Sequence, residues 1–369
     1  MAVKVGAILM SQNSQDHLRG ADEPEGLHEG STAFFQDEIK SGELALSVGF
    51  DGIWSVEHHF RSHGESPSPL QLLTFFAGRA PQASLGTCVV VLPWNDPIRV
   101  AEQIALLDNM MAPGSRLTLG FGRGSAQSEY DGFDIPLGES TDRFRENWEI
   151  VRRLLTEENV TYEGKWRNIR NLTTLPRPRS KDLLSRCYYS WGSRSSLEYA
   201  AAMGFMPIFV PKGSADEYAR DMARFNDIRG ERGWGPVSPI VSLCVFADDD
   251  EDYALTEGRK YMREFYSHTL DHYERLDAKH FEAAGNYQEQ AEKAARNAAR
   301  DRNELLDEMV NLQLFGTPNQ ILKRLEEWRE VTRPSQFLFA MRFGGMSYET
   351  AERNMRTIAG SVLPEIEHW

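Results

Sequence analysis

Eight hydrophobic runs alternate with helix-like stretches along this chain of 369 residues, and the alternation limits the folds open to it. Each run is short and nearly continuous in apolar residues, as expected of strands that are buried on both faces. Strands that alternate with helices pair in parallel through right-handed crossovers. The predicted strands are 3–10, 53–57, 84–92, 117–121, 186–191, 206–210, 240–247 and 336–341.

Eight such units predict an α/β fold of one domain over residues 1–369, a (β/α)8 barrel, also called a TIM barrel. The alternative is a doubly wound Rossmann sheet, because Gly120-Phe121-Gly122-Arg123-Gly124 superficially resembles its glycine loop. A long polar loop follows that segment instead of an immediate helix. The barrel is therefore the favoured fold.

The longest helical region, residues 250–309, follows the seventh strand. Within it, residues 277–302 contain few large apolar side chains, so we predict an exposed helical insert at about 277–310. Its place after a strand puts it at the C-terminal face of a barrel. It is either a lid over that face or a solvated excursion without a gating role.

Charge and cysteine content narrow the function classes. The net charge of −14 argues against nucleic acid or an anionic membrane surface as a partner, and no apolar run is long enough to span a membrane. Cys88, Cys187 and Cys244 lie far apart in hydrophobic runs, as reduced core residues do. With a first strand that begins directly after Met1, these features predict a cytoplasmic protein.

Glu57-His58-His59 closes the second predicted strand and is the first candidate for catalysis. An imidazole can give or take a proton near neutral pH, and a carboxylate can orient it. Adjacent residues of a strand face opposite sides, so His58 and His59 are poorly placed to bind one metal ion, and we expect no metal site. One histidine of the pair is expected to be catalytic and the other packed.

A second candidate lies at the end of the fifth predicted strand, where a glycine and three serines precede a helix. Helix N-terminal amides and hydroxyls can hold a phosphate, and Arg123 from the neighbouring strand end, with Arg143, could complete the site. The alternative is ordinary helix capping by Ser193, with Ser195 and Ser196 exposed. The run is Trp191-Gly192-Ser193-Arg194-Ser195-Ser196.

Five further stretches of the sequence are informative together: 52–60 with its Glu-His-His, 85–93, 96–102, 119–124 and Gly316-Thr317-Pro318. In order and spacing they resemble the bacterial luciferase-like flavin monooxygenases. The resemblance implies a (β/α)8 barrel, a homodimer, reduced FMN supplied by a separate flavin reductase, and O2 as co-substrate. It also implies oxygenation of a small organic substrate through a C4a-(hydro)peroxyflavin.

Residue roles carry over from the same resemblance. The family's catalytic histidine falls on His58, with Glu57 and His59 as its neighbours in the motif. Its flavin phosphate site falls on Arg123, Arg143, Ser193 and Ser196, and a cis peptide beside the flavin ring falls on Cys88-Val89.

Two positions depart from luciferase, which has a reactive cysteine at the place of Gly122 and a glutamate at the place of Gly192. Light emission from a long-chain aldehyde is therefore not implied. Two alternatives stay open: an oxidoreductase of the same fold that uses the deazaflavin F420, and a non-catalytic partner subunit.

Overall fold

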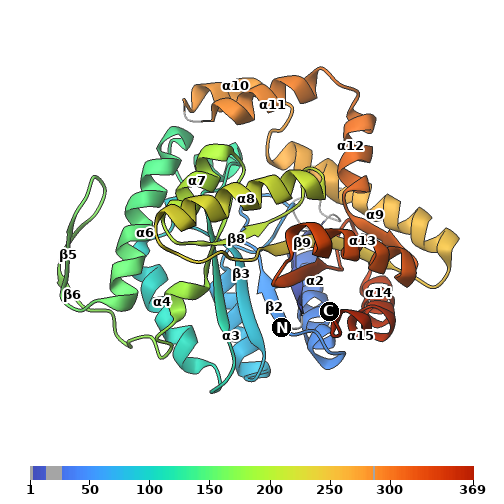
Figure 1. The fold of residues 1–369 in the computed structure, drawn as a ribbon, viewed down its shortest axis with the longest axis horizontal. Coiled ribbons are helices and arrows are strands. Elements are labelled where there is room, and N and C mark those ends of the chain that lie inside the picture. Colours follow the sequence, from blue (N-terminus) through green and yellow to red (C-terminus); the bar gives the residue numbers. More distant parts are fainter. Residues whose placement is uncertain (1–2, 14–26, 286) are drawn as a thin grey trace.

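The computed structural model describes residues 3–13, 27–285 and 287–369. Within them, eight parallel strands form one closed sheet, because β8 pairs with β9 as well as with β7. The closed ring confirms the (β/α)8 barrel and rules out the doubly wound sheet (Figure 1). Its strands are β1 (Lys4–Leu9), β2 (Gly52–Ser55), β3 (Ser84–Val91), β4 (Leu117–Gly122), β7 (Cys187–Ser190), β8 (Met206–Phe209), β9 (Ile240–Ala247) and β11 (Gln336–Ala340).

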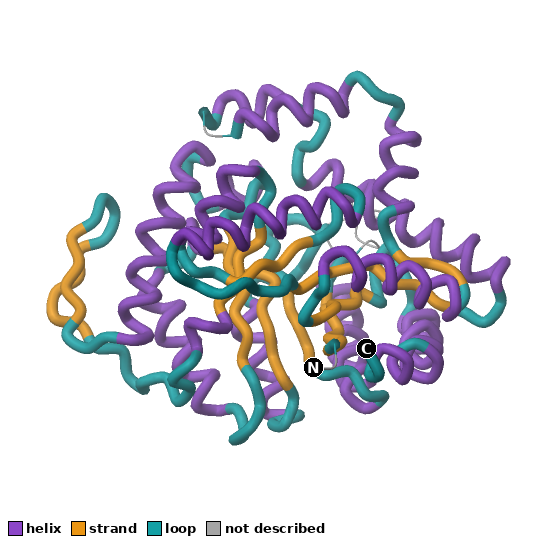
Figure 2. Tube along the Cα trace, viewed as in Figure 1, coloured by secondary structure: helices purple, strands orange, loops and turns teal. Residues whose placement is uncertain are grey.

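Helices surround the strands, as Figure 2 shows. The outer helices are α2 (Leu27–Ser47), α3 (Pro69–Arg79), α4 (Pro97–Met110), α6 (Ser140–Thr156), α7 (Arg194–Ala202), α8 (Ala215–Glu231), α13 (Pro318–Thr332), α14 (Tyr348–Ser361) and α15 (Leu363–Ile366). Their starts follow local chemistry: Asp96 accepts hydrogen bonds from the first amides of α4, and Pro97 occupies its first turn.

Alternate residues of each strand face two different cores. On β9, Val241 and Leu243 pack outward against the helices, whereas Ile240 and Cys244 pack inside the barrel. Trp54 fills the interior so tightly that a Cβ atom added to Gly86 would lie 2.4 Å from its indole. The barrel is thus a packed core, and chemistry is confined to its mouth.

Shorter elements depart from the sequence expectations. A hairpin after α6 is formed by β5 (Val160–Glu163) and β6 (Asn168–Leu172), outside the eight predicted strands. A short strand that we did not predict, β10 (Leu314–Gly316), pairs with the end of β9. The polar loop after β4 contains a helix, α5 (Gln127–Gly132), and a 3₁₀ turn at Leu137–Glu139.

The long helical region after β9 consists of four helices, α9 (Glu251–His272), α10 (Ala278–Ala283), α11 (Gln288–Ala298) and α12 (Arg302–Asn311). In Figure 1, α10 and α11 lie across one end of the barrel. The prediction of an exposed insert is wrong for their inner face: Phe281 and Tyr287 are buried with Tyr130 and Leu137 from the segment after β4. A few large side chains on α10 and α11 are enough for this small core, because the segment after β4 supplies the remaining apolar side chains.

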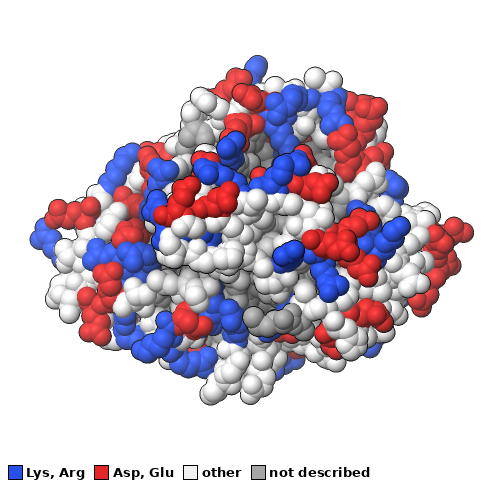
Figure 3. Space-filling view, viewed as in Figure 1, with Lys and Arg blue, Asp and Glu red and all other residues white. Residues whose placement is uncertain are grey.

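Charges of both signs are interspersed over the face shown in Figure 3. All three cysteines are free, as predicted. Among the described residues, every helix is too short or too polar to cross a membrane.

Asn354 connects the outer helix α14 to the barrel, and its replacement tests the packing. Its buried side chain accepts a hydrogen bond from Ala247 N (2.8 Å) and donates to Val245 O (2.8 Å) and Met341 O (3.0 Å). Asn354→Ala leaves these groups unpaired, so we expect the free energy of unfolding in urea to fall by about 2–4 kcal/mol. The exposed Arg356→Ala on the same helix should change it by less than about 1 kcal/mol. Equal effects would show that these bonds do not stabilise the barrel.

Candidate active site

The predicted site residues lie where the strands end at the mouth of the barrel. Glu57-His58-His59 follows β2, and Arg123 follows β4. The Cys88-Val89 peptide in β3 is cis, as the family resemblance implied. Burial raises the pKa of the Cys88 thiol to about 12, so this sulfur is a neutral thiol.

Glu57 is a buried anchor for the loops around it. Its Oε2 accepts a hydrogen bond from Val91 N (3.0 Å), and its Oε1 accepts from Trp94 Nε1 (2.6 Å) and Asn95 Nδ2 (2.8 Å). The same Oε1 lies 3.2 Å from His59 Nε2. Glu57 therefore ties the end of β2 to the turn after β3 and holds His59 in place. The two histidines have different partners: His59 contacts Glu57, whereas His58 contacts a second carboxylate.

That second carboxylate is Glu129 of α5, which sequence reasoning missed. Its Oε1 lies 3.1 Å from His58 Nδ1 and accepts a hydrogen bond from His59 N (2.9 Å). His272 Nε2 is at ion-pair distance, 3.6 Å. Burial alone would raise the pKa of Glu129, but hydrogen bonds and charge from His272 and His58 outweigh it and hold this pKa well below its usual range.

A carboxylate at Nδ1 favours the His58 tautomer that carries its proton there, which leaves the Nε2 lone pair free to accept. His58 Nε2 lies 3.3 Å from the hydroxyl of Tyr273, at the end of α9 and 215 positions away in sequence. Burial raises the pKa of Tyr273, so its hydroxyl keeps its proton. The arrangement is a buried chain of carboxylate, imidazole and phenol.

Two further histidines join this group. The rings of His63 and His272 stack with centroids 4.4 Å apart, and each lies within 5.0 Å of the His58 ring. One nitrogen from each of the three rings lies within 4.8 Å of one nitrogen of each other ring, so these residues could hold a metal ion, and the expectation of no metal site stays a prediction. Because His58 and His272 both lie against Glu129, we describe the group as an imidazole cluster around this carboxylate. The sequence analysis did not predict that His63 and His272 would lie beside His58.

Arg123 and the start of α7 form the candidate phosphate site. The Arg123 guanidinium donates to Thr141 Oγ1 and lies 5.0 Å from the centre of the Tyr287 ring. At α7, Ser193 and Ser196 form a reciprocal capping box, as the capping alternative expected. Ser195 is exposed, but Ser196 is buried, contrary to that alternative.

A carboxylate already occupies this helix end. Glu289 of α11 accepts a hydrogen bond from Arg194 N at 3.1 Å. Because Tyr287 touches Arg123 and Glu289 touches Arg194, the start of α11 joins the two halves of the candidate phosphate site. The α7 terminus thus attracts an anionic group, which is the property that phosphate binding requires.

Of three further predicted cofactor residues, Trp191 and Arg143 point elsewhere, whereas Gly192 donates its backbone N–H to Ser196 Oγ (3.3 Å). Gly192 is exposed, and an added Cβ would come no closer than 4.0 Å to Gln290 Nε2. The Trp191 ring is buried between Phe209 and Phe225. Arg143 pairs with Glu139 at 2.8 Å and stacks on Trp166.

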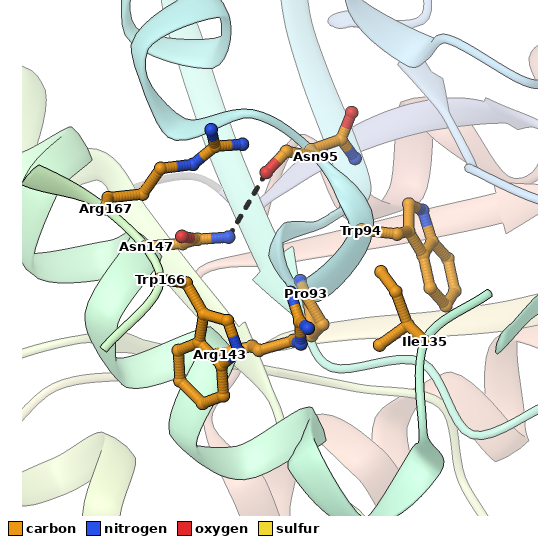
Figure 4. Close-up of a pocket in the computed structure, with 8 residues that line it drawn as sticks. All are labelled: Pro93, Trp94, Asn95, Ile135, Arg143, Asn147, Trp166 and Arg167. Carbon is orange, nitrogen blue, oxygen red and sulfur yellow. Dashed lines mark hydrogen bonds between the residues drawn. The ribbon is translucent and has the colours of Figure 1, made fainter. Parts of the chain in front are cut away.

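Arg143 lines a separate cavity of about 290 Å³ (Figure 4). Across it, Asn147 donates to Asn95 O (3.2 Å), and Arg167 also faces the space. Among the described contacts, none joins Arg143 to Arg123 or to the serines. Of the predicted phosphate ligands, Arg123 and the serine-rich start of α7 are therefore both in contact with the start of α11. Arg143 is not.

The buried imidazoles predict how stability depends on pH. Burial, then repulsion from His58 and His272, lowers the pKa of His63 well below 6.5, and burial also lowers that of His272. Above pH 6.5 both rings are neutral in the folded and the unfolded chain. Below it only the unfolded chain takes up these protons, so the free energy of unfolding should fall by up to about 1.4 kcal/mol per pH unit for each excluded proton.

Urea unfolding measured from pH 8 to pH 5 checks this expectation. His63→Gln should flatten the decline below pH 6.5, whereas His368→Gln, at an exposed histidine, should leave the profile parallel to wild type. Identical profiles for wild type and His63→Gln would contradict the assignment of a neutral buried His63.

Solved structures with this fold include several oxidoreductases. The monooxygenase RslO1 from Streptomyces bottropensis is 26% identical with a TM-score of 0.75, over 98% of this chain and 99% of that one. The oxygenating constituent of 3,6-diketocamphane monooxygenase from Pseudomonas putida, a type II Baeyer-Villiger monooxygenase in complex with FMN, is 20% identical with a TM-score of 0.73, over 99% of each chain.

The coenzyme F420-dependent tetrahydromethanopterin reductase from Methanopyrus kandleri is 18% identical with a TM-score of 0.68, over 99% of this chain and 100% of that one. The fold therefore serves both FMN and F420 enzymes.

Residues 3–333 match the luciferase-like monooxygenase family. That match covers most of the 369 residues and includes β2, β4, α7 and the insert, so the chain belongs to the luciferase-like monooxygenases.

Proposed function

We propose that this chain is the oxygenase component of a two-component monooxygenase. It takes reduced FMN from a separate flavin reductase and uses O2 to oxygenate a small organic substrate. The observation that carries the proposal is the pairing of a buried His58–Glu129–Tyr273 chain with an anion-attracting helix end and Arg123 at the same mouth. On the family resemblance, we also propose a cytoplasmic homodimer.

The residues present fit the phosphate of a flavin mononucleotide. The α7 terminus holds the Glu289 carboxylate at 3.1 Å from Arg194 N, and a phosphate could take the same position once Glu289 withdraws. Arg123 would supply a second set of donors, and Ser193 and Ser196 the hydroxyls. The bound flavin supplies the reactivity toward O2, and the chain supplies binding, orientation and proton control.

His58 is the proton-handling group in this proposal. Its Nε2 can accept a proton from a neighbouring donor or return it, with the Tyr273 hydroxyl at 3.3 Å as the adjacent link. Glu129 stabilises the ring when it carries the extra proton and keeps its orientation. Tyr287 and the rest of the α10–α11 core cover the Arg123 side of the mouth and exclude water there.

An F420-dependent oxidoreductase is the second candidate, because an enzyme of that class shares the fold and because a deazaflavin cofactor also carries a phosphate. A non-catalytic subunit fits less well. Such a chain would need neither the His58–Tyr273 pair nor an anion-attracting helix end at α7.

Variants at His58 and Glu129 test the proton-handling role. In stopped-flow oxidation of enzyme-bound reduced FMN by O2, His58→Ala should change the observed rate by about a hundredfold or more, the lower end of acid–base contributions. Glu129→Gln should retain activity with its pH profile moved to lower pH, because the neutral amide no longer favours a protonated neighbour.

The exposed Glu282→Gln on α10 is the matched control and should leave rate and pH profile unchanged. An unchanged rate in His58→Ala would rule out its proposed role. An unchanged pH profile in Glu129→Gln would reduce Glu129 to a packing residue.

Glu289 provides a separate test of the phosphate site. If FMN phosphate replaces its carboxylate at the α7 terminus, Glu289→Gln should tighten FMN binding by about threefold or more, as expected for removing a charge that competes at a helix end. Glu292→Gln, exposed on the same helix, should not. Equal FMN dissociation constants for Glu289→Gln and wild type, measured by fluorescence quenching, would place the phosphate elsewhere.

A further inference from the structure

Three buried histidines from different segments of the chain face one another at the mouth of the barrel. His58 follows β2, His63 lies in a turn between β2 and α3, and His272 is the last residue of α9. Each ring offers one nitrogen, and these three nitrogens all lie within 4.8 Å of one another. Among the described residues, no other three histidine, cysteine or acidic side chains are close enough to share a metal ion.

The loop after β2 folds back and brings His63 to His58. Gly64 permits this close approach, since a Cβ atom at its position would lie 2.8 Å from the Cβ of His58. A hydrogen bond from His58 N to Ser66 O (3.1 Å) holds the returning loop. The ring centroids of His58 and His63 are 4.8 Å apart. The proximity of these two rings therefore follows from the path of the backbone.

Nitrogens of two of the rings are not used by other protein groups. Both ring nitrogens of His272 and the Nδ1 of His63 are buried and have no hydrogen-bond partner among the described residues. His272 is only 1% exposed and His63 only 3%. A neutral imidazole carries one N–H and one lone pair, and it is costly to bury either of them unpaired. An ion bound to the lone pairs would offset part of that cost.

Glu129 supplies the carboxylate that commonly accompanies histidine ligands. Such ligands usually donate their second ring nitrogen to a carboxylate, which orients the ring and makes the other nitrogen a better ligand. Glu129 Oε1 lies 3.1 Å from His58 Nδ1 and 3.6 Å from His272 Nε2. The nitrogens left for an ion are then His58 Nε2 and His272 Nδ1. The negative charge of Glu129 also reduces the cost of placing a divalent cation beside it.

We propose that His58, His63 and His272 bind one divalent metal ion such as Zn²⁺, and that the bound ion blocks the proton handling of His58. Zn–N bonds are about 2.0–2.1 Å long, so the three rings rotate toward one another when the ion binds. The ion takes the lone pair of His58 Nε2 and displaces the hydrogen bond to the Tyr273 hydroxyl, 3.3 Å away. The block rests on the function proposed above, whereas the binding of the ion does not.

The ligand set also determines which ions fit. Three imidazoles suit Zn²⁺, Co²⁺, Ni²⁺ or Cu²⁺, whereas Mg²⁺ and Ca²⁺ prefer oxygen ligands. His59 is held apart from the group, because its Nε2 lies 3.2 Å from Glu57 Oε1. Our expectation of no metal site considered only the adjacent pair His58 and His59. The further ligands, His63 and His272, are brought to His58 by the fold.

Titration of the whole chain, first freed of metal with a chelator, tests the binding. Calorimetry should show one Zn²⁺ ion per chain in wild type and no comparable binding of Mg²⁺. Co²⁺ at the same site should give visible absorption bands without the thiolate charge-transfer band that a cysteine ligand would add. Equal binding of Zn²⁺ and Mg²⁺, or a thiolate band, would overturn the proposal.

Variants of the cluster locate the ion. Glu129→Gln should weaken Zn²⁺ binding by about tenfold to a hundredfold, the usual effect of losing the carboxylate behind a histidine ligand. His63→Gln and His272→Gln should weaken it further, because each loses a ligand. The exposed His368→Gln is the matched control and should bind Zn²⁺ as wild type does. Equal Zn²⁺ affinities in wild type and both ligand variants would place the ion elsewhere and contradict the proposal.

Thermal unfolding separates lost binding from lost folding. Zn²⁺ should raise the unfolding temperature of wild type and His368→Gln, and should leave that of His63→Gln and His272→Gln unchanged. The wild-type measurement needs no variant, so a folding defect in a ligand variant does not prevent the test. A wild-type unfolding temperature that Zn²⁺ fails to raise would contradict the proposal.

Oxidation of bound reduced FMN by O2, with and without Zn²⁺, tests the block at His58. Zn²⁺ should change the wild-type rate in the same direction and about as far as His58→Ala does, and a chelator should restore it. His63→Gln and His272→Gln should each react at one rate with and without Zn²⁺. A bound ion that leaves the wild-type rate unchanged would overturn the block. If wild type binds Zn²⁺ but no FMN, the proposed function fails and the metal site stands.

Discussion

The buried carboxylate of Glu129 holds the mouth of the barrel together. It contacts His58 and the backbone of His59 after β2, comes within 3.6 Å of His272 at the end of α9, and is itself carried by α5 after β4. A buried anion without partners would be costly, so the packing of these elements depends on the hydrogen bonds that His58 and the His59 backbone donate to it. The fold thereby fixes the tautomer of His58 and brings Tyr273 to its other nitrogen.

The insert after β9 completes the site. It supplies His272 and Tyr273 beside Glu129 and His58, and Tyr287 and Glu289 beside Arg123 and the start of α7. Its small apolar core with Tyr130 and Leu137 holds it against the segment after β4. One of its charges already occupies an anion site, because Glu289 accepts a hydrogen bond from Arg194 N at the start of α7.

The strand alternation predicted the barrel well, because parallel strands buried on both faces leave a strong hydrophobic signal. Strand-end positions likewise located His58, Arg123 and Ser193 at one mouth. Glu129 was not predictable in the same way, because it sits in a polar segment that reads as a loop. His272 and Tyr273 lie in a helical region more than two hundred positions from His58, so only the tertiary fold brings them there. The predicted role of Arg143 stays a prediction: a helix start does not determine which face a side chain takes, and this one pairs with Glu139 and stacks on Trp166.

The central claim is that this mouth binds reduced FMN for chemistry with O2. Parallel anaerobic titrations of wild type and Arg123→Gln with reduced FMN and with reduced F420 test it most directly. We expect wild type to bind reduced FMN about tenfold or more tightly than F420, and Arg123→Gln to bind FMN more weakly. Tighter binding of F420, or binding of neither cofactor, would contradict it.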